Sequence, residues 1–265
     1  MNIIIPIKQV PETSNVKMDP ETGTMIRDGV ESIINPLDLY AIEVGIQLKE
    51  EHGGKVTVIT MGPPSASKAL KEAIAMGCDD GILVTDRKFA GSDTWSTAYV
   101  LAEAIKKIGE YDLVLAGERA TDGDTGQVGP NIAAELDLTL GTYISKVEEV
   151  DKDKIVVERL LEEGYEKLEL PLPSLLTVVK EISYPRLPTL RGKQRAKKSE
   201  LPSLTVKDMD FDETKLGLKG SPTRVVKIET PKVTRGGTIV SAKDDDQLEE
   251  AVDKLVEFLK TKEIV

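Results

Sequence analysis

The sequence predicts an α/β fold in which helices flank a mainly parallel β-sheet. Short apolar runs alternate with amphipathic stretches through roughly the first half of the 265 residues, and turns rich in glycine, proline or aspartate separate them. Repeated strand–helix units of this kind connect through right-handed crossovers, so their strands lie parallel in one sheet. Ligands bind at the carboxyl ends of the strands in such sheets, and a functional site is expected there.

Each element of this half follows from its own residues. Continuous apolar runs predict buried strands at residues 2–7, 55–60, 81–85 and 113–116. Asn35 as an N-cap and Pro36 at the first helical position predict a helix that runs to about residue 49. Further helices are expected at residues 65–77, 94–108 and 125–136. In one of them a stripe of apolar side chains indicates core packing, namely Trp95, Tyr99, Ala102 and Ile105.

The pattern changes after about residue 141. Residues 154–161 and 166–170 predict a hairpin around Glu163 and Gly164, and residues 174–179 predict another apolar strand. Residues 183–243 are rich in proline and charge and have little periodicity, so we interpret them as an arm that lies on a partner. A helix is expected at about residues 246–262. We therefore expect a 1–183 domain with an inserted hairpin, and a 184–265 region that ends in a helix.

Composition excludes several functions. The net charge of -11 and the aromatic content of 4% argue against nucleic acid and anionic membranes as general ligands. Cys78 and His52 are the only residues of their types, which excludes an internal disulfide and nearly excludes Cys/His metal sites. His52 ends a polar helix, where a solvated side chain is a better interpretation than a catalytic one. Met1 leads directly into an apolar strand and no stretch has the length of a membrane span, so we expect a cytoplasmic protein.

The loop at residues 117–129, which follows the fourth strand, is the strongest candidate for a binding site. Its glycines permit close backbone approach, and the helix after it offers free N–H groups to a phosphate. Asp122 or Asp124 would suit ribose hydroxyls. An ordinary Asp-Gly turn with a capped helix explains the same residues, because neither G-x-G-x-x-G nor a P-loop is present. Loops 61–64 and 89–97 would face the same crevice, although capping by Ser92 or Asp93 also explains the second of them.

Residues 184–198 form a strongly basic segment in an acidic protein. Leucines braced by prolines lie between the charges, which suits an anchor on an acidic protein surface better than nucleic acid. A solvated loop is the alternative. The acidic runs at residues 162–163 and 244–246 lie in turns without partner ligands, so we interpret them as solvated charge rather than as catalytic or metal carboxylates.

The chain resembles the electron-transfer flavoprotein beta family along essentially its whole length. The resemblance rests on IKQVP at 7–11, DG at 28–29, NP at 35–36, AIAMG at 73–77, DGDTGQVG at 122–129, the 159–177 hairpin and the basic segment. It implies a Rossmann-like nucleotide-binding fold of the adenine-nucleotide alpha hydrolase type. It also implies an alpha subunit that carries FAD, and electron exchange with a flavoenzyme like the acyl-CoA dehydrogenases.

The resemblance carries site residues onto this chain. The nucleotide site would comprise Ile7, Lys8, Asn35, Asp38, Met61, Gly62, Phe89, Thr94, Gly117, Ala120, Asp122, Gly123, Asp124, Thr125, Gly126, Gln127 and Val128. The partner-recognition segment would comprise Leu187, Leu190, Arg191, Lys193, Arg195 and Lys197, with Leu190 at the position of the anchoring leucine. Flavin supplies the chemistry in this family, so no catalytic acid or base and no metal are expected.

The family divides according to the nucleotide in the beta site. Some members hold AMP there, and electron-bifurcating members hold a second FAD with NADH beside it. Residues 60–64, 86–94 and 191–192 resemble the bifurcating type. The expected reaction is hydride transfer from NADH, with one electron passing to the dehydrogenase-like partner through the alpha-subunit FAD and the other to ferredoxin or flavodoxin. The alternatives are a single-electron carrier with AMP and, from another class, a nucleotide-sensing module of the universal-stress type.

Overall fold

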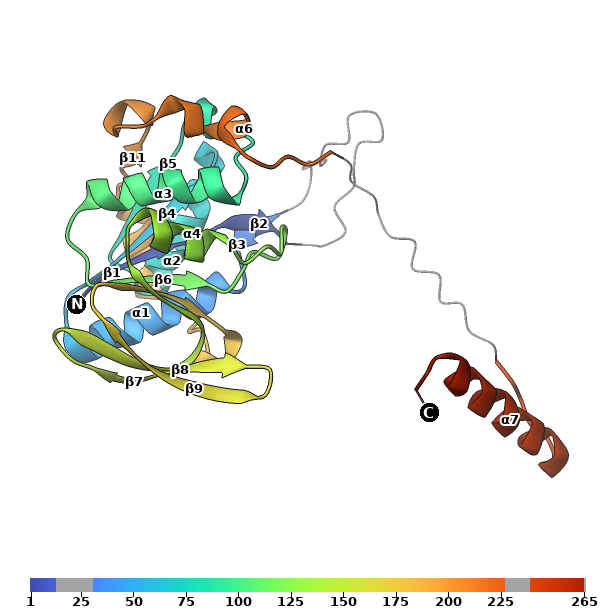
Figure 1. Cartoon of the computed structure of the whole chain (residues 1–265). Coiled ribbons are helices and arrows are strands. Elements are labelled where there is room, and N and C mark those ends of the chain that lie inside the picture. Colours follow the sequence, from blue (N-terminus) through green and yellow to red (C-terminus); the bar gives the residue numbers. More distant parts are fainter. Residues whose placement is uncertain (13–30, 227–238, 265) are drawn as a thin grey trace. The chain divides into compact units, whose positions relative to one another are not determined.

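The chain forms two compact units, Met1–Val226 and Lys227–Val265. Their structure, a computed structural model, describes residues 1–12, 31–226 and 239–264 (Figure 1). The predicted motif at residues 28–29 lies outside the described residues. We refer to the first unit as the α/β unit.

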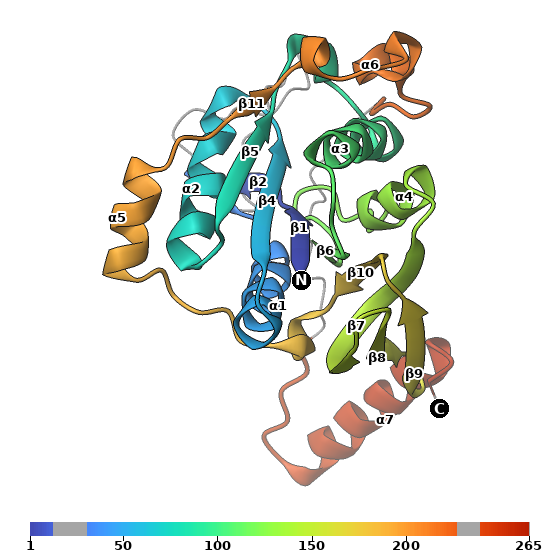
Figure 2. The same cartoon turned by 90° about the vertical axis from the view of Figure 1, so that its left-hand side faces the viewer.

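A nine-stranded sheet forms the centre of the α/β unit, with the strand order β11-β5-β4-β1-β6-β10-β7-β8-β9 (Figure 2). All neighbouring pairs from β11 to β7 are parallel, and the β7–β8 and β8–β9 pairs are antiparallel. The bounds are β1 Asn2–Pro6, β4 Lys55–Met61, β5 Asp80–Val84, β6 Leu113–Gly117, β7 Thr139–Val150, β8 Lys154–Leu161, β9 Gly164–Pro171, β10 Ser174–Val178 and β11 Ser203–Leu204. The expected mainly parallel sheet flanked by helices, a Rossmann-like arrangement, is confirmed.

Helices cover both faces of the parallel part of the sheet. On one face lie α1 (Asp38–His52) and α2 (Ser67–Met76), and on the other lie α3 (Thr94–Ile108) and α4 (Val128–Glu135) (Figure 2). Alternate side chains of β1 point into separate cores: Ile3 and Ile5 pack in the α1 and α2 layer, whereas Ile4 packs against α3 and α4. Burial on both faces is the reason why β1 is a continuous apolar run.

Several boundaries differ from those that the sequence predicts. Helix α1 begins at Asp38 rather than beside Asn35, whose side chain makes tertiary hydrogen bonds instead of capping the helix. Helix α4 begins at Val128, so the loop before it is longer than expected. Strand β7 was not predicted. Residues 174–179 do return to the main sheet, because β10 lies between β6 and β7.

Part of the expected arm belongs to the α/β unit, which continues to Val226 rather than ending at residue 183. Helix α5 (Leu190–Lys198) packs closely on α2. The glycine at position 192 permits this approach, because a Cβ there would lie only 2.0 Å from the carbonyl oxygen of Ala75. The Arg195 guanidinium donates to the carbonyl oxygens of Ile74 and Cys78, both at 2.7 Å. This stretch is therefore held by its own domain, and the interpretation that residues 183–243 lie on a partner stays a prediction.

Short elements complete the α/β unit. They are the two-stranded sheet of β2 (Gln9–Pro11) and β3 (Ser32–Ile34), the 3₁₀ turns at Pro64–Ala66, Arg87–Phe89, Lys180–Ile182, Val206–Asp208 and Glu213–Lys215, and α6 (Gly217–Gly220). Strand β11 adds residues of the expected arm to the edge of the main sheet beside β5.

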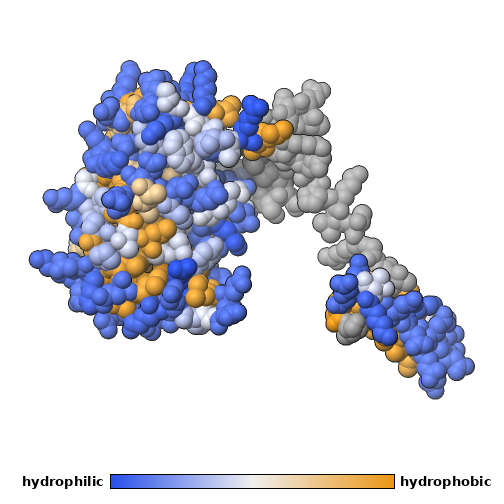
Figure 3. All heavy atoms as spheres, viewed as in Figure 1, coloured by the Kyte–Doolittle hydropathy of each residue, from blue (hydrophilic) through white to orange (hydrophobic). Residues whose placement is uncertain are grey.

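The second unit is described over residues 239–264 and contains α7 (Asp245–Thr261). Asp244 caps this helix by accepting from the backbone N–H of Gln247 at 2.9 Å. Its apolar side chains gather along one side of the helix and are largely exposed (Figure 3). No helix among the described residues is long and apolar enough to cross a membrane. The cytoplasmic location stays a prediction.

Candidate functional site

A cavity of about 500 Å³ opens at the carboxyl ends of the parallel strands β1, β4 and β6. Its apolar lining comes from the ends of these strands and from neighbouring elements, and includes Ile7, Met61, Phe89 and Leu101. The glycine-rich loop between β6 and α4 forms the opposite, polar wall. An apolar concavity with a few convergent polar groups at this edge of a parallel sheet is the usual form of a small-molecule site.

A buried group of polar side chains, which we call the Asn35–Asp38 node, holds the cavity together. The Asp38 carboxylate accepts from the backbone N–H of Lys8 at 2.7 Å and from the Asn35 amide at 2.9 Å. The same amide nitrogen donates to the backbone carbonyl oxygen of Arg119 at 2.9 Å, and the side-chain oxygen of Asn35, Oδ1, accepts from the backbone N–H of Thr121 at 3.1 Å. The node therefore connects the end of β1, the start of α1 and the loop after β6.

Burial governs the charge of Asp38. Removal from water raises the pKa of its carboxyl from 3.8 to about 7, against the hydrogen bonds from Asn35 and Lys8, which favour the ionised form. The carboxyl lines the cavity. Gly117 lies directly against it, because a Cβ on Gly117 would be 2.4 Å from Asp38 Oδ1. A glycine is required at this position for the loop to leave β6 beside the node.

The two helices that begin at the cavity differ at their N-termini. Asp93 caps α3 by accepting from the N–H of Ser96 at 3.0 Å, so a carboxylate already occupies that end. No side chain caps α4. Because the first N–H groups of a helix attract anions, α4 rather than α3 offers the better position for a phosphate. The Thr94 hydroxyl donates to Gln127 Oε1 at 2.8 Å and joins the two helix starts across the cavity.

Most of the residues predicted for the nucleotide site line this cavity. They are Ile7, Lys8, Asp38, Met61, Phe89, Thr94, Gly117, Ala120, Gly123, Thr125, Gly126, Gln127 and Val128. The structure brings them together from loops that are far apart in the sequence, in agreement with the expectation that these loops face one crevice. Their binding of a nucleotide stays a prediction.

Four residues predicted for the site do not line the cavity. Asn35 supports it through the node, and the N–H of Gly62 bonds to the Val84 carbonyl oxygen, an extension of the sheet. Asp122 pairs with Lys8 at 2.7 Å, and Asp124 pairs with Arg119 at 2.8 Å. Both carboxylates pair with cations beside the cavity, and their binding of ribose hydroxyls stays a prediction.

Further residues line the cavity. Inside the loops that the sequence predicted to face the crevice these are Gly91, Ser92, Asp93, Thr97, Glu118, Arg119 and Gly129, and outside those loops they are Pro6, Leu101, Ala116 and Val225, which the sequence missed as site residues. Thr97 and Leu101 follow Thr94 at helical spacing, so extending the α3 face from Thr94 would have found them. No local pattern indicates Val225, which reaches the cavity through the tertiary fold.

The residues predicted to bind a partner differ in their surroundings. Leu187 and Leu190 are 85% and 83% exposed, and Arg191, Lys193 and Lys197 are also exposed. The guanidinium of Arg195 instead donates to backbone carbonyl oxygens in and just after α2, as described above.

Arg186 fixes the start of this basic segment. Its guanidinium donates to both carboxylate oxygens of the buried Glu43, at 2.9–3.2 Å, and to both of Glu50, at 2.6 and 2.9 Å. This double pairing to α1 holds the chain just before Leu187 and Leu190. The exposed leucines therefore project from a fixed base.

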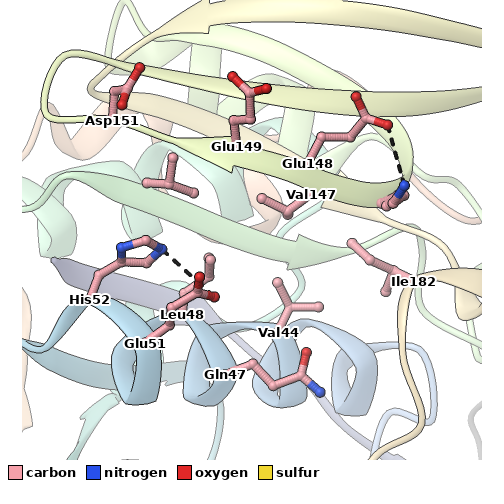
Figure 4. A pocket seen from close by; sticks show the side chains of 12 residues that line it. Val44, Gln47, Leu48, Glu51, His52, Val147, Glu148, Glu149, Asp151 and Ile182 are labelled. Carbon is pink, nitrogen blue, oxygen red and sulfur yellow. Dashed lines mark hydrogen bonds and ion pairs between the residues drawn. The ribbon is translucent and has the colours of Figure 1, made fainter.

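A second cavity, of about 470 Å³, lies between the C-terminal half of α1 and the outer half of β7 (Figure 4). Acidic side chains surround its apolar floor, and Glu51 lies 3.9 Å from the only histidine, His52. It has no glycine-rich loop, and its charge would repel a phosphate. Among the described residues no cluster of His, Cys, Asp or Glu is arranged to hold a metal ion.

The fold and the first cavity define the chain as an α/β protein with a candidate ligand cavity at the carboxyl edge of a Rossmann-like sheet. Residues 22–209 match the family described as the electron transfer flavoprotein domain. The chain therefore belongs to the electron-transfer flavoprotein family.

Curated relatives extend the similarity over the full length. The chain is 50% identical to the electron transfer flavoprotein subunit beta of Thermoanaerobacterium thermosaccharolyticum, with 100% of both chains covered. It is 46% identical to the subunit of the same name from Clostridium acetobutylicum, with 98% of both chains covered. It is 44% identical to the caffeyl-CoA reductase-Etf complex subunit CarD of Acetobacterium woodii, with 100% of both covered.

The raised pKa of Asp38 predicts a specific pH dependence of stability. The folded protein binds this proton more tightly than the unfolded chain, so the carboxyl costs stability as the pH rises from about 4 to about 7. Across this pH range we expect the free energy of unfolding of the wild type to fall by a few kcal/mol relative to that of Asp38→Asn, since one pKa unit corresponds to about 1.4 kcal/mol. Urea unfolding at a series of pH values measures this difference.

Only the pH dependence is compared, so a constant offset from altered hydrogen bonds in Asp38→Asn cancels. The control is Asp210→Asn, at an exposed carboxylate. Parallel stability curves for the wild type and Asp38→Asn would show that Asp38 titrates as it does in the unfolded chain.

Proposed function

We propose that this chain is the beta subunit of a heterodimeric electron-transfer flavoprotein that holds FAD in the cavity and takes its electrons from NADH. Its further partners are an alpha subunit that carries FAD, a flavoenzyme like the acyl-CoA dehydrogenases, and ferredoxin or flavodoxin. The observation that carries the proposal is the cavity at the strand ends, with an apolar wall on one side and a glycine-rich loop and an uncapped helix on the other.

The residues present fit a dinucleotide. An aromatic ring system needs an apolar slot, which Ile7, Met61 and Phe89 supply. A phosphate needs N–H donors, and the start of α4 supplies them without a competing side-chain cap. The chain at Gly126 has φ +63°, a conformation that favours glycine and lets the backbone approach a ligand closely.

A bound flavin would supply the conversion between two-electron and one-electron transfer. The residues of this chain would bind the flavin, orient it and shield it from water. Lys8 and Arg119 line the cavity, but their charges are paired with Asp122 and Asp124, so the N–H groups at the start of α4 are the main donors to a pyrophosphate. The apolar wall excludes water from the ring. The Asn35–Asp38 node fixes the loop after β6 against β1, so the cavity keeps its shape before any ligand enters.

Two observations favour FAD and bifurcation over AMP. Phe89 and Thr94, from the 86–94 pattern that resembles the bifurcating type, both line the cavity. A relative that matches the full chain is named as a subunit of a caffeyl-CoA reductase-Etf complex, which supports a reductase-type flavoenzyme as the partner. With AMP in the cavity, the protein would be a single-electron carrier.

An anaerobic assay with the heterodimer, its partner dehydrogenase and ferredoxin tests this function. We expect NADH to reduce ferredoxin only when the dehydrogenase and its electron-accepting substrate are present, because the two electrons of NADH must leave by separate routes. The spectrum of reduced ferredoxin is the readout. A heterodimer that exchanges electrons with the dehydrogenase but is never reduced by NADH would be the simple carrier, and the proposal would fail.

We further propose that the exposed leucines before and at the start of α5 anchor the dehydrogenase. We expect Leu190→Ala to weaken docking about 30-fold, the loss that is usual when a buried hot-spot side chain is truncated. Surface plasmon resonance with the purified heterodimer measures the dissociation constant.

The control for this docking experiment is Leu161→Ala, which truncates another exposed leucine (42%) of the α/β unit, in the β8–β9 hairpin away from the cavity. Cofactor content should be unchanged in both variants. Equal dissociation constants for Leu190→Ala and the wild type would remove Leu190 from the docking surface.

A further inference from the structure

Residues 221–226, which we call the exit segment, are the last described part of the α/β unit, and Val225 in this segment lines the cavity. Nothing in the local sequence explains why the segment lies there. Its position comes from contacts with the loop and helix start at residues 87–99, on the α3 side of the cavity.

Asp93 makes the central contacts. Its Oδ1 caps α3 by accepting from the N–H of Ser96 at 3.0 Å. Its Oδ2 accepts from both the backbone N–H and the hydroxyl of Thr223, at 2.9 and 2.8 Å. The backbone N–H of Asp93 donates to the Ser221 hydroxyl at 2.8 Å. A single residue therefore joins the start of α3 to the exit segment at two points.

The chain before the exit segment is fastened to the same wall. The Ser96 hydroxyl donates to the carbonyl oxygen of Lys215 at 2.8 Å, and the N–H of Leu218 donates to that of Ala90 at 3.1 Å. Phe89, whose ring lies 5.5 Å from that of Phe211, also lines the cavity. The base of the exit segment is thus held firmly, and Asp93 decides where its last residues lie.

We propose that Asp93 is a positioning residue that holds the exit segment over the cavity, so that Val225 closes one side of a bound nucleotide cofactor. The inference rests on the proposed function in one respect, namely that the cavity binds a nucleotide. The ligand and the exit segment stabilise each other, because Val225 contacts the ligand only while the Asp93–Thr223 hydrogen bonds hold. Ligand binding therefore orders the point at which the chain leaves the α/β unit for the C-terminal unit.

Two variants separate this role from helix capping. Asp93→Asn keeps an oxygen for the Ser96 N–H, and asparagine is as good an N-cap as aspartate. The NH2 group of the introduced asparagine then faces the backbone N–H of Thr223. Because both groups are donors, this hydrogen bond is lost and the exit segment is released. Thr223→Val removes only the hydroxyl donor. Glu213→Ala, which breaks an exposed ion pair with Lys88 on the same stretch of chain, is the matched control.

The measurements are the rate of FAD release from the purified heterodimer and hydrogen exchange of the peptide at residues 217–226 with and without FAD. In the wild type, FAD should protect this peptide. Asp93→Asn should abolish the protection and release FAD about tenfold faster, because hydrogen bonds to a charged group are lost. Thr223→Val should have a smaller effect in the same direction, and Glu213→Ala none.

A wild-type release rate in Asp93→Asn, or no protection by FAD in the wild type, would overturn the positioning role. If the wild type holds AMP instead of FAD, the proposed function fails. The same two measurements with AMP as the probe then decide the role of Asp93.

Discussion

The Asn35–Asp38 node is the interaction on which the site depends. A single asparagine amide reaches the start of α1 and the loop after β6, and the Asp38 carboxylate fixes the backbone at Lys8. Both side chains are buried, and a buried polar group without a partner is costly, so each group constrains the others. The cost appears in the pKa of Asp38, which burial raises to about 7. Gly117 completes the node, because a side chain there would collide with the carboxylate.

The cavity that the node supports has two unlike walls, and their difference accounts for the proposed chemistry. The α4 side presents free N–H groups and glycines, which suit phosphates. On the α3 side, the Asp93 cap disfavours anions, and the apolar side chains of Phe89 and Leu101 suit a ring. A dinucleotide has both parts. Asp93 also accepts from Thr223, so the α3 wall of the cavity holds the chain that leads to the C-terminal unit.

The elements that could be predicted from the sequence are those that depend on their own residues. The elements that were missed depend on contacts with distant parts of the chain. Buried strands such as β1 are apolar throughout, and α3 has an aspartate cap and a glycine stop, so their positions were predictable. The outer half of β7 carries Lys146, Glu148 and Glu149 on a largely solvated antiparallel ribbon, so its sequence resembles that of a loop. Helix α5 has no long apolar stripe, because its contact with α2 is made by two small residues, Gly192 and Ala196. At the site, the glycine-rich loop was predictable from its residues. The pairing of Asp124 with Arg119 was not, because it depends on a turn with positive φ at Asp124.

The content of the cavity tests the central claim most directly. The chain is co-expressed with its alpha subunit, and FAD and AMP are counted per purified heterodimer by absorbance and chromatography. We expect two FAD molecules and no AMP in the wild type. We expect one FAD in Thr97→Phe, whose added ring would fill the cavity from α3. One FAD and one AMP in the wild type would contradict FAD binding in this cavity, and two FAD molecules in Thr97→Phe would place the second flavin elsewhere.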